Sequence, residues 1–220
     1  MSTPTIRRLE APELGDRVML AIDTSLGTSV ALGTDGWIVE ASSEDPRGHA
    51  EHIGTLIERV FAEAECAASR VTDVIAGMGP GPFTGLRVGI AAAHAFAVGR
   101  GLRILPVVSH DAAALEILEA GAVSGVRVVQ DAKRRELFVT EYASLDWAGL
   151  PVRIGDPHLA PREGYESVPN ETWPEHVRAG ALVRLAARRI VSGRPFEEDR
   201  ALYLRLPDVM PPSAPKPVTP

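Results

Sequence analysis

The segment 77–89 constrains the fold more than any other part of the chain, and it reads GMGPGPFTGLRVG. It joins an apolar run, residues 71–78, to a helical segment that begins near Phe83. Gly85 and Gly89 fall inside that helix, where each glycine costs about 1 kcal/mol relative to alanine. Two glycines at such positions need a local reason. Either a backbone or a ligand approaches closely here, or another helix packs tightly on this face.

A phosphate-binding loop is one function that this segment suggests, because helix N-termini present free N–H groups and a positive dipole. The segment has no Gly-Lys-Ser/Thr of a Walker loop, and Pro80 and Pro82 remove two N–H donors. The alternative is packing, since Gly85 and Gly89 are four residues apart and would leave a flat patch on one helical face. The loss of these donors makes a phosphate site the weaker interpretation and leaves close packing of another helix as the alternative.

Composition excludes several classes of protein. The chain has 220 residues, of which 45% are hydrophobic and 24% charged, as in ordinary globular proteins. A net charge of −6 argues against a stand-alone nucleic-acid binder, unless a basic partner supplies the contacts. No apolar run reaches the roughly 20 residues of a membrane helix, and no secretion signal is evident. The single cysteine, Cys66, excludes an internal disulfide, so we expect a cytoplasmic protein.

The order of predicted elements indicates an α/β fold. Three short strands joined by glycine-containing turns predict an antiparallel meander at 18–23, 29–33 and 37–42. Helices and strands then alternate, with helices at 49–64, 83–98 and 111–120 (Ser109 as its cap) and strands at 71–78 and 104–108. A second half restarts with strands at 126–131 and 136–142 and ends in a helix at 179–192, with no element predicted over 144–174.

This order excludes a simple doubly wound sheet and matches two ribonuclease-H-like lobes of the actin and sugar-kinase superfamily, the second lobe being reduced. We predict a flexible leader over 1–17, a first lobe over 18–108 and a smaller second lobe over 109–206. A disordered proline-rich tail is predicted over 207–220. Met19 is a possible alternative start.

Two aspartates are the candidate ligand-binding residues of this fold. Asp23 and Asp131 each end an apolar strand, one in each half, and Thr24 follows Asp23. Strand-end carboxylates that face each other across a cleft could hold Mg²⁺ and nucleotide phosphates. Each aspartate could equally cap its own turn. Asp23, Thr24 and Asp131 are therefore candidate residues of a nucleotide cleft, with turn capping as the alternative.

The segments described above resemble the TsaB family, the bacterial partner of TsaD in making N6-threonylcarbamoyladenosine on tRNA. The resemblance is carried by LAIDTS at 20–25, HAEH at 49–52, GPGPFTGLRVG at 79–89, DAKRRELF at 131–138 and YLR at 203–205. One departure is Pro82, where the family usually has serine. The resemblance implies a non-catalytic subunit that dimerises with TsaD and activates it.

The same resemblance implies that this chain has no catalytic residue and no metal site. TsaD-type enzymes bind their metal through two histidines four residues apart at the start of a helix. Here that helix start carries His110 and Ala114, and alanine cannot ligate a metal. The chain is therefore interpreted as a catalytically silent paralogue with a vestigial cleft at Asp23, Thr24 and Asp131. It would need no cofactor, although a nucleotide could bind at the interface with TsaD.

The resemblance also implies a docking surface on the helices 49–64 and 83–98, although these helices could instead cover only their own sheet. The predicted interface residues are His52, Ile53, Leu56, Ile57, Val60, Phe83, Thr84, Gly85, Leu86, Arg87, Gly89 and Ile90. Expected partners are TsaD, TsaE on that dimer and a second copy when alone, with only indirect contact to tRNA and none to a membrane. The alternatives are a metal-dependent glycoprotease-like hydrolase and a sugar-kinase-like ATPase.

Overall fold

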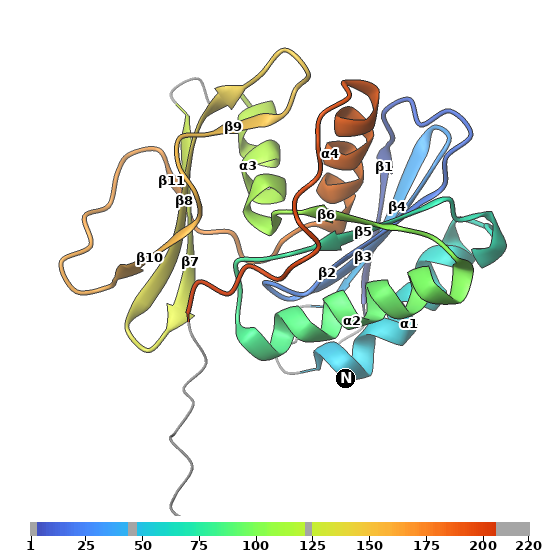
Figure 1. The fold of residues 1–220 in the computed structure, drawn as a ribbon, viewed down its shortest axis with the longest axis horizontal. Coiled ribbons are helices and arrows are strands. Elements are labelled where there is room, and N and C mark those ends of the chain that lie inside the picture. Colours follow the sequence, from blue (N-terminus) through green and yellow to red (C-terminus); the bar gives the residue numbers. More distant parts are fainter. Residues whose placement is uncertain (1–3, 44–47, 122–124, 206–220) are drawn as a thin grey trace, which may run out of the picture.

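The computed structural model describes residues 4–43, 48–121 and 125–205. In that part of the chain, a six-stranded sheet and a five-stranded sheet lie side by side, with helices packed on their faces (Figure 1). The fold class is α/β with mixed sheets, and it opens with an antiparallel meander as predicted. Residues 44–47 of the predicted loop before the first helix and the tail from Pro207 lie outside the described residues.

The first sheet has the strand order β1-β4-β3-β2-β5-β6. Strands β2, β3 and β4 form the antiparallel meander, and β5 and β6 continue the sheet in parallel to β2. The bounds are Thr5–Glu10 for β1, Met19–Asp23 for β2, Thr28–Thr34 for β3, Trp37–Ser43 for β4, Asp73–Gly77 for β5 and Ile104–Val107 for β6. Every residue of β2 is buried, because helices cover both faces of the sheet.

Helices α1 (His49–Glu63) and α2 (Phe83–Arg100) cover one face of this sheet, and α4 (Ala179–Val191) covers the other (Figure 1). Leu56 and Val60 of α1 pack in one core with Leu20 and Ile22 of β2. The opposite core contains Leu182 of α4. The apolar residues of α1 recur at the spacing of one helical face, which is why its position could be predicted.

The second sheet has the order β10-β8-β7-β11, with β9 paired to β8. Its strands are β7 (Val126–Lys133), β8 (Glu136–Leu145), β9 (Pro151–Arg153), β10 (His158–Pro161) and β11 (Glu171–Thr172). Helix α3 (Ser109–Glu119) packs on β7 and β8 and also against α4. A short 3-10 turn, Ala68–Arg70, precedes β5.

Two predicted boundaries are corrected by the structure. The leader predicted over residues 1–17 contains strand β1, the edge strand of the first sheet, which pairs with β4 over six residues. An edge strand is half-exposed and mixed in polarity, so the run at 5–10 resembled a polar leader. Helix α4, predicted as part of the second lobe, packs on the first sheet, because its apolar stripe completes that core.

Strands β9, β10 and β11 fall in residues 144–174, where no element was predicted. They are only three, four and two residues long, so no periodic pattern can develop within them. Their existence depends on pairing with the long strands β7 and β8. Tertiary pairing therefore decides this region.

Candidate functional site

Gly77 and Gly81 of the segment 77–89 lie against the end of β2 and the turn that follows it. A Cβ atom on Gly77 would lie 1.8 Å from Oδ2 of Asp23, and one on Gly81 would lie 2.8 Å from the Cα of Ser25. These distances leave no room for any side chain. The close approach predicted for this segment is thus made by the chain's own backbone and side chains.

Thr24 fills the space beside Gly85 and Gly89 in the same way. The Thr24 hydroxyl donates to the carbonyl of Gly85 at 2.7 Å and accepts from the N–H of Gly89 at 3.0 Å. A Cβ atom on Gly89 would lie 2.2 Å from this hydroxyl oxygen. The prediction that Gly85 and Gly89 form a flat patch for a partner is therefore wrong, because both face the interior of this chain.

Asp23 is fully buried at the end of β2, where the chain meets the segment 77–89. Its Oδ1 accepts hydrogen bonds from the backbone N–H and the hydroxyl of Ser25 at 2.8 and 2.6 Å. Its Oδ2 accepts from the Ser109 hydroxyl at 2.6 Å, and that hydroxyl accepts from the N–H of Gly79 at 2.9 Å. Burial raises the pKa of Asp23, while the hydrogen bonds from Ser109 and Ser25 oppose the shift. The carboxylate ties β2 to the start of α3.

Ser109 was predicted to cap α3, and the structure corrects this. The N-cap residue is Val108, and no side chain caps the helix. The Ser109 hydroxyl is used by Asp23 and Gly79 instead. A carboxylate 86 residues away in the sequence is a partner that local pattern cannot reveal.

The side chain of Asp131 does not lie in the same site as that of Asp23. Its Oδ1 accepts from the backbone N–H of Lys133 at 3.0 Å, and Arg162 lies 3.1 Å away. The preceding residue, Gln130, donates from Nε2 to the carbonyl of Ser25 at 2.8 Å. Because consecutive strand residues point to opposite faces, Asp131 faces away from the first sheet. Each aspartate caps its own turn, which was the alternative interpretation.

Gln130 and Ser109 are site residues that the sequence reasoning missed. Gln130 is a buried polar side chain that directly follows the apolar pair Val128 and Val129, and that contrast was the available signal. Together with Asp23, Thr24 and Ser25 they form a closed hydrogen-bonded junction between the two sheets. The polar groups that the fold could offer to a ligand here are bonded to one another.

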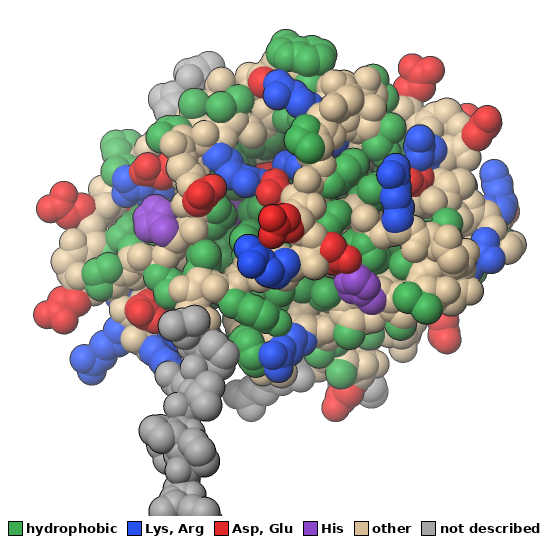
Figure 2. All heavy atoms as spheres, viewed as in Figure 1, with side chains coloured by type: hydrophobic (Ala, Val, Ile, Leu, Met, Phe, Trp, Pro, Cys, Tyr) green, Lys and Arg blue, Asp and Glu red, His purple; other side chains and the backbone are tan. Residues whose placement is uncertain are grey.

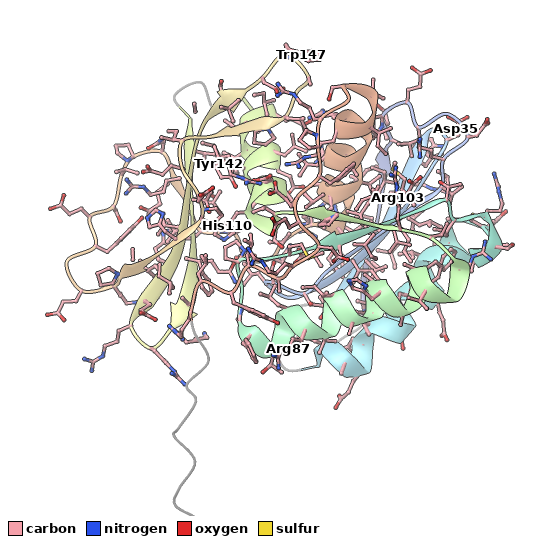
Figure 3. The ribbon with its side chains drawn as sticks, viewed as in Figure 1. Asp35, Arg87, Arg103, His110, Tyr142 and Trp147 are labelled. Carbon is pink, nitrogen blue, oxygen red and sulfur yellow. The ribbon has the colours of Figure 1, made fainter. Side chains whose placement is uncertain are left out.

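His110 is fully buried on the inner side of the second sheet, near Tyr142 (Figure 3). Its Nδ1 lies 2.8 Å from the Thr140 hydroxyl and its Nε2 lies 3.2 Å from Oε1 of Gln130. Both ring nitrogens are therefore used within the chain. Ala114, one turn later on α3, is also fully buried. Among the described residues, no group of three or more His, Cys, Asp or Glu side chains could hold a metal ion.

Burial lowers the pKa of His110 to about 4, opposed by Gln130 and assisted by the charge of Arg153. In the unfolded chain His110 has its ordinary pKa of 6.5, so it takes up a proton at a higher pH than in the folded chain. The contribution of His110 to the free energy of unfolding is therefore fully present above pH 6.5 and is lost as the pH falls toward 4. We expect the free energy of unfolding to be about 2 kcal/mol lower at pH 5 than at pH 8 through this residue. Urea unfolding at both pH values checks this, and His110→Gln should remove that part of the difference.

The predicted interface residues divide into buried and exposed sets. Ile53, Leu56, Val60 and Leu86 belong to the core of this chain and cannot contact a partner. His52 is also buried, whereas Ile57, Phe83 and Ile90 are half-buried and Thr84 and Arg87 are exposed. The earlier alternative, that the helices cover their own sheet, is thus correct for the first set. Residues of the stripe that predicted α1 were mistaken for a surface.

The outer face of α2 is uncharged over most of its length. Thr84, Ala91, Ala95 and Val98 are exposed there, and only Arg87 adds a charge. Helical geometry places these five residues within one quadrant of the helix, opposite the buried Gly89 and Ala93. We call this surface the α2 face. Its residues from Ala91 onward were not in the predicted interface.

The segment 196–205 crosses one side of the α2 face (Figure 1). The Arg87 guanidinium lies 3.7 Å from the centre of the Phe83 ring and donates from Nε to the Tyr203 hydroxyl at 3.1 Å. His94 and Asp199 lie 3.0 Å apart, and the Leu202 N–H donates to the Met78 carbonyl at 2.8 Å. Figure 3 shows Arg87 at the start of α2, where this segment ends.

The first sheet contains an antiparallel meander and has helices on both faces, and a second mixed sheet lies beside it. This arrangement defines an α/β protein of the ribonuclease-H-like class. YeaZ from Pseudomonas aeruginosa has the same fold, with a TM-score of 0.76 at 24% identity over 86% of this chain and 100% of that one. Residues 42–149 match the family model described as "TsaD: tRNA N6-adenosine threonylcarbamoyltransferase". None of the described helices has both the length and the apolar character to span a membrane.

Within this class, the resemblance to TsaB is confirmed. The chain is 31% identical over 124 residues to the tRNA threonylcarbamoyladenosine biosynthesis protein TsaB of Haemophilus influenzae. It is 30% identical over 125 residues to TsaB of Escherichia coli. These matches cover 56% of this chain and 52% and 54% of the two relatives. The chain thus spans about half the length of the curated relatives it matches.

Proposed function

We propose that this chain is a non-catalytic subunit in N6-threonylcarbamoyladenosine synthesis that dimerises with a TsaD-type enzyme and activates it. The observation that carries the proposal is the contrast between the closed junction and the exposed, largely uncharged α2 face. A nucleotide or metal site needs free polar groups, and Asp23, Thr24 and His110 are bonded within the chain. A docking site needs exposed uncharged surface, and α2 has it.

The partner is argued from similarity between the two proteins. A tRNA N6-adenosine threonylcarbamoyltransferase of Streptococcus suis is 39% identical over 113 residues, 42% of this chain and 33% of that protein. Related chains carry related surfaces, so they can pair face to face much as identical chains do. Thr84, Ala91 and Ala95 of the α2 face are small, which lets a second helix approach closely. Without the enzyme, the same face would form a homodimer, and TsaE would join the assembled heterodimer.

Substitution on the α2 face tests this proposal. Ala91→Glu places a carboxylate in the middle of the proposed interface, where desolvation without a partner is costly. We expect the affinity for the TsaD-type enzyme to fall at least tenfold, with an unchanged melting temperature, because Ala91 is exposed. Isothermal titration calorimetry with the purified enzyme measures the affinity.

Ala62→Glu is the matched control, since Ala62 is an exposed helical alanine on the outer side of α1. It should leave the affinity unchanged. Equal affinities for both variants would place the interface elsewhere. Leu56→Asp is unsuitable, because Leu56 is fully buried and its loss would unfold the chain itself.

Reconstitution tests the assigned role. The chain alone should transfer no threonylcarbamoyl group to tRNA, and adding it to the TsaD-type enzyme should restore transfer. Unaided transfer by the chain would reject a non-catalytic role. Tight binding of Mg-ATP by the isolated chain would instead support the sugar-kinase-like alternative.

A further inference from the structure

Arg87 is the charged residue of the α2 face, and two aromatic residues hold its guanidinium in place. The ring centre of Phe83, one turn earlier on α2, lies 3.7 Å from the guanidinium carbon. The Tyr203 hydroxyl accepts a hydrogen bond from Nε at 3.1 Å, and the ring centres of Tyr203 and Phe83 lie 4.8 Å apart. We call Phe83, Arg87 and Tyr203 the Arg87 cluster.

Tyr203 is fixed by contacts of the residues on either side of it. The Leu202 N–H donates to the Met78 carbonyl at 2.8 Å, and Arg205 forms an ion pair with Glu136 of β8. The Tyr203 hydroxyl therefore stays beside Arg87. A free arginine side chain has a large rotamer entropy, which is normally lost when it binds a partner. In the Arg87 cluster part of this entropy is already lost before binding, so binding costs less.

The terminal nitrogens of Arg87, Nη1 and Nη2, remain available for a further partner. Arg87 is exposed, and in the described part of the chain its guanidinium contacts Phe83 and Tyr203. No Asp or Glu within residues 4–43, 48–121 and 125–205 forms an ion pair with it. The first turn of α2 contains no acidic residue, so the helix dipole adds to the positive potential here. This end of the α2 face therefore attracts an anion from outside the chain.

Binding of a partner to the α2 face would remove Arg87 from water. Burial of a guanidinium without an anion beside it is costly. Thr84 and Ala91, one turn away on either side of Arg87, carry no charge that could compensate it. The partner must therefore supply the anion. A planar guanidinium with free N–H groups binds a carboxylate or a phosphate through two parallel hydrogen bonds.

We propose that Arg87 binds an Asp or Glu side chain of the TsaD-type enzyme through Nη1 and Nη2. A protein carboxylate fits this site better than the backbone of a nucleic acid, whose phosphates are normally held by several cations. Arg87 is the one cation of the α2 face, and Figure 2 shows hydrophobic side chains next to a basic one over the start of α2. This inference rests on the proposed function for the identity of the partner, and it adds the chemical group that the partner presents.

Two substitutions of Arg87 test the ion pair. Arg87→Met leaves the partner's carboxylate buried without a cation, so the affinity for the TsaD-type enzyme should fall about thirtyfold. Arg87→Lys keeps the charge but cannot donate two parallel hydrogen bonds, so the affinity should fall about fivefold. Isothermal titration calorimetry measures both affinities. Circular dichroism should show both variants folded, because Arg87 is exposed.

Arg103→Met is the matched control. Arg103 is also exposed and forms no ion pair with a described residue, and Figure 3 shows it well away from Arg87. Its substitution should leave the affinity unchanged. Equal affinities of Arg87→Met and Arg103→Met overturn the inference. Wild-type affinity of Arg87→Lys also overturns it, because the two parallel hydrogen bonds would then contribute nothing.

Double-mutant cycles with the enzyme identify the carboxylate. One Asp→Asn or Glu→Gln substitution in the enzyme should lower its affinity for the wild-type chain without lowering further its affinity for Arg87→Met. If no acidic residue of the enzyme behaves in this way, the inference is wrong. It is also wrong if Arg87→Met binds the enzyme normally while the isolated chain loses affinity for tRNA or Mg-ATP, because Arg87 would then hold a phosphate.

Failure of the proposed function gives a different result. A wild-type chain that does not bind the TsaD-type enzyme overturns the proposed function, and this inference with it. A wild-type chain that binds the enzyme with an affinity independent of Arg87 leaves the proposed function intact and overturns this inference alone.

Discussion

Arg153→Met is expected to lower the free energy of unfolding by about 3 kcal/mol. Arg153 binds Asp111 with two hydrogen bonds, from Nε to Oδ1 at 2.7 Å and from Nη2 to Oδ2 at 2.6 Å. Asp111 is only 2% exposed, so removal of the guanidinium leaves a buried carboxylate with fewer partners. The expected loss of free energy of unfolding lies at the low end of the range for broken buried ion pairs, because Arg189 remains 3.2 Å from Asp111.

The effect is large because this cluster joins separate layers of the molecule. Asp111 lies on α3, Arg153 on β9 of the second sheet and Arg189 on α4, which covers the first sheet. Glu197 adds a fourth contact, 2.8 Å from Arg153, from the segment that crosses the α2 face. Breaking the pair therefore weakens the attachment of the second sheet to the first as well as one ion pair.

Urea unfolding followed by circular dichroism measures the change. Adding Asp111→Asn to Arg153→Met should recover part of the loss, because the buried charge is then removed together with its partner. A single-variant loss below about 1 kcal/mol would show that the pair behaves like an exposed salt bridge. The unfolding curve should stay cooperative in either case, since α3 on the second sheet packs against α4 on the first.

Gly89→Ala should destabilise the protein by about 3 kcal/mol, whereas Gly99→Ala on the same helix should stabilise it by roughly 0.5–1 kcal/mol. Both changes gain the same helix propensity. At Gly89 the new Cβ would meet the Thr24 hydroxyl, so two buried hydrogen bonds are displaced as well. At Gly99 nothing lies within 4 Å of the new atom.

Thermal unfolding of the two variants checks the opposite signs. Thr24→Ala should partly rescue Gly89→Ala, because it removes the hydroxyl that the new methyl group meets. If both glycine variants shifted the melting temperature in the same direction, the contact with Thr24 would not determine the stability of Gly89→Ala. The comparison is internally controlled, since both residues lie on α2 and differ only in what surrounds them.

Local features of the fold were predictable from sequence. The stripe of Leu56 and Val60 predicts α1, and the glycine-containing turns predict the meander, because both signals arise within a few neighbouring residues. That Ala114 occupies the place of a metal ligand is what the resemblance to TsaD-type enzymes implies, and it stays a prediction. Strand β1 and the position of α4 were not predictable, since each depends on a surface built by distant residues.

The candidate site shows the same division. Asp23 and Asp131 were correctly noticed as polar ends of apolar runs, yet their surroundings differ completely. Asp23 is buried among Ser25 and Ser109, while Asp131 caps an exposed turn beside Arg162. A one-residue difference in strand position decides which side chain, Gln130 or Asp131, faces the first sheet.

The sequence by itself determined that something approaches the backbone at Gly85 and Gly89, because a helix carries two central glycines only under such a constraint. It could not determine what approaches. The tertiary structure decided that the neighbour is Thr24, more than 60 residues earlier in the chain. Helix propensity is a local property, whereas this contact exists only after β2 and α2 have packed together. The segment 77–89 is thus a closed internal junction, and the exposed, largely uncharged face on which we propose a partner binds lies on the opposite side of α2.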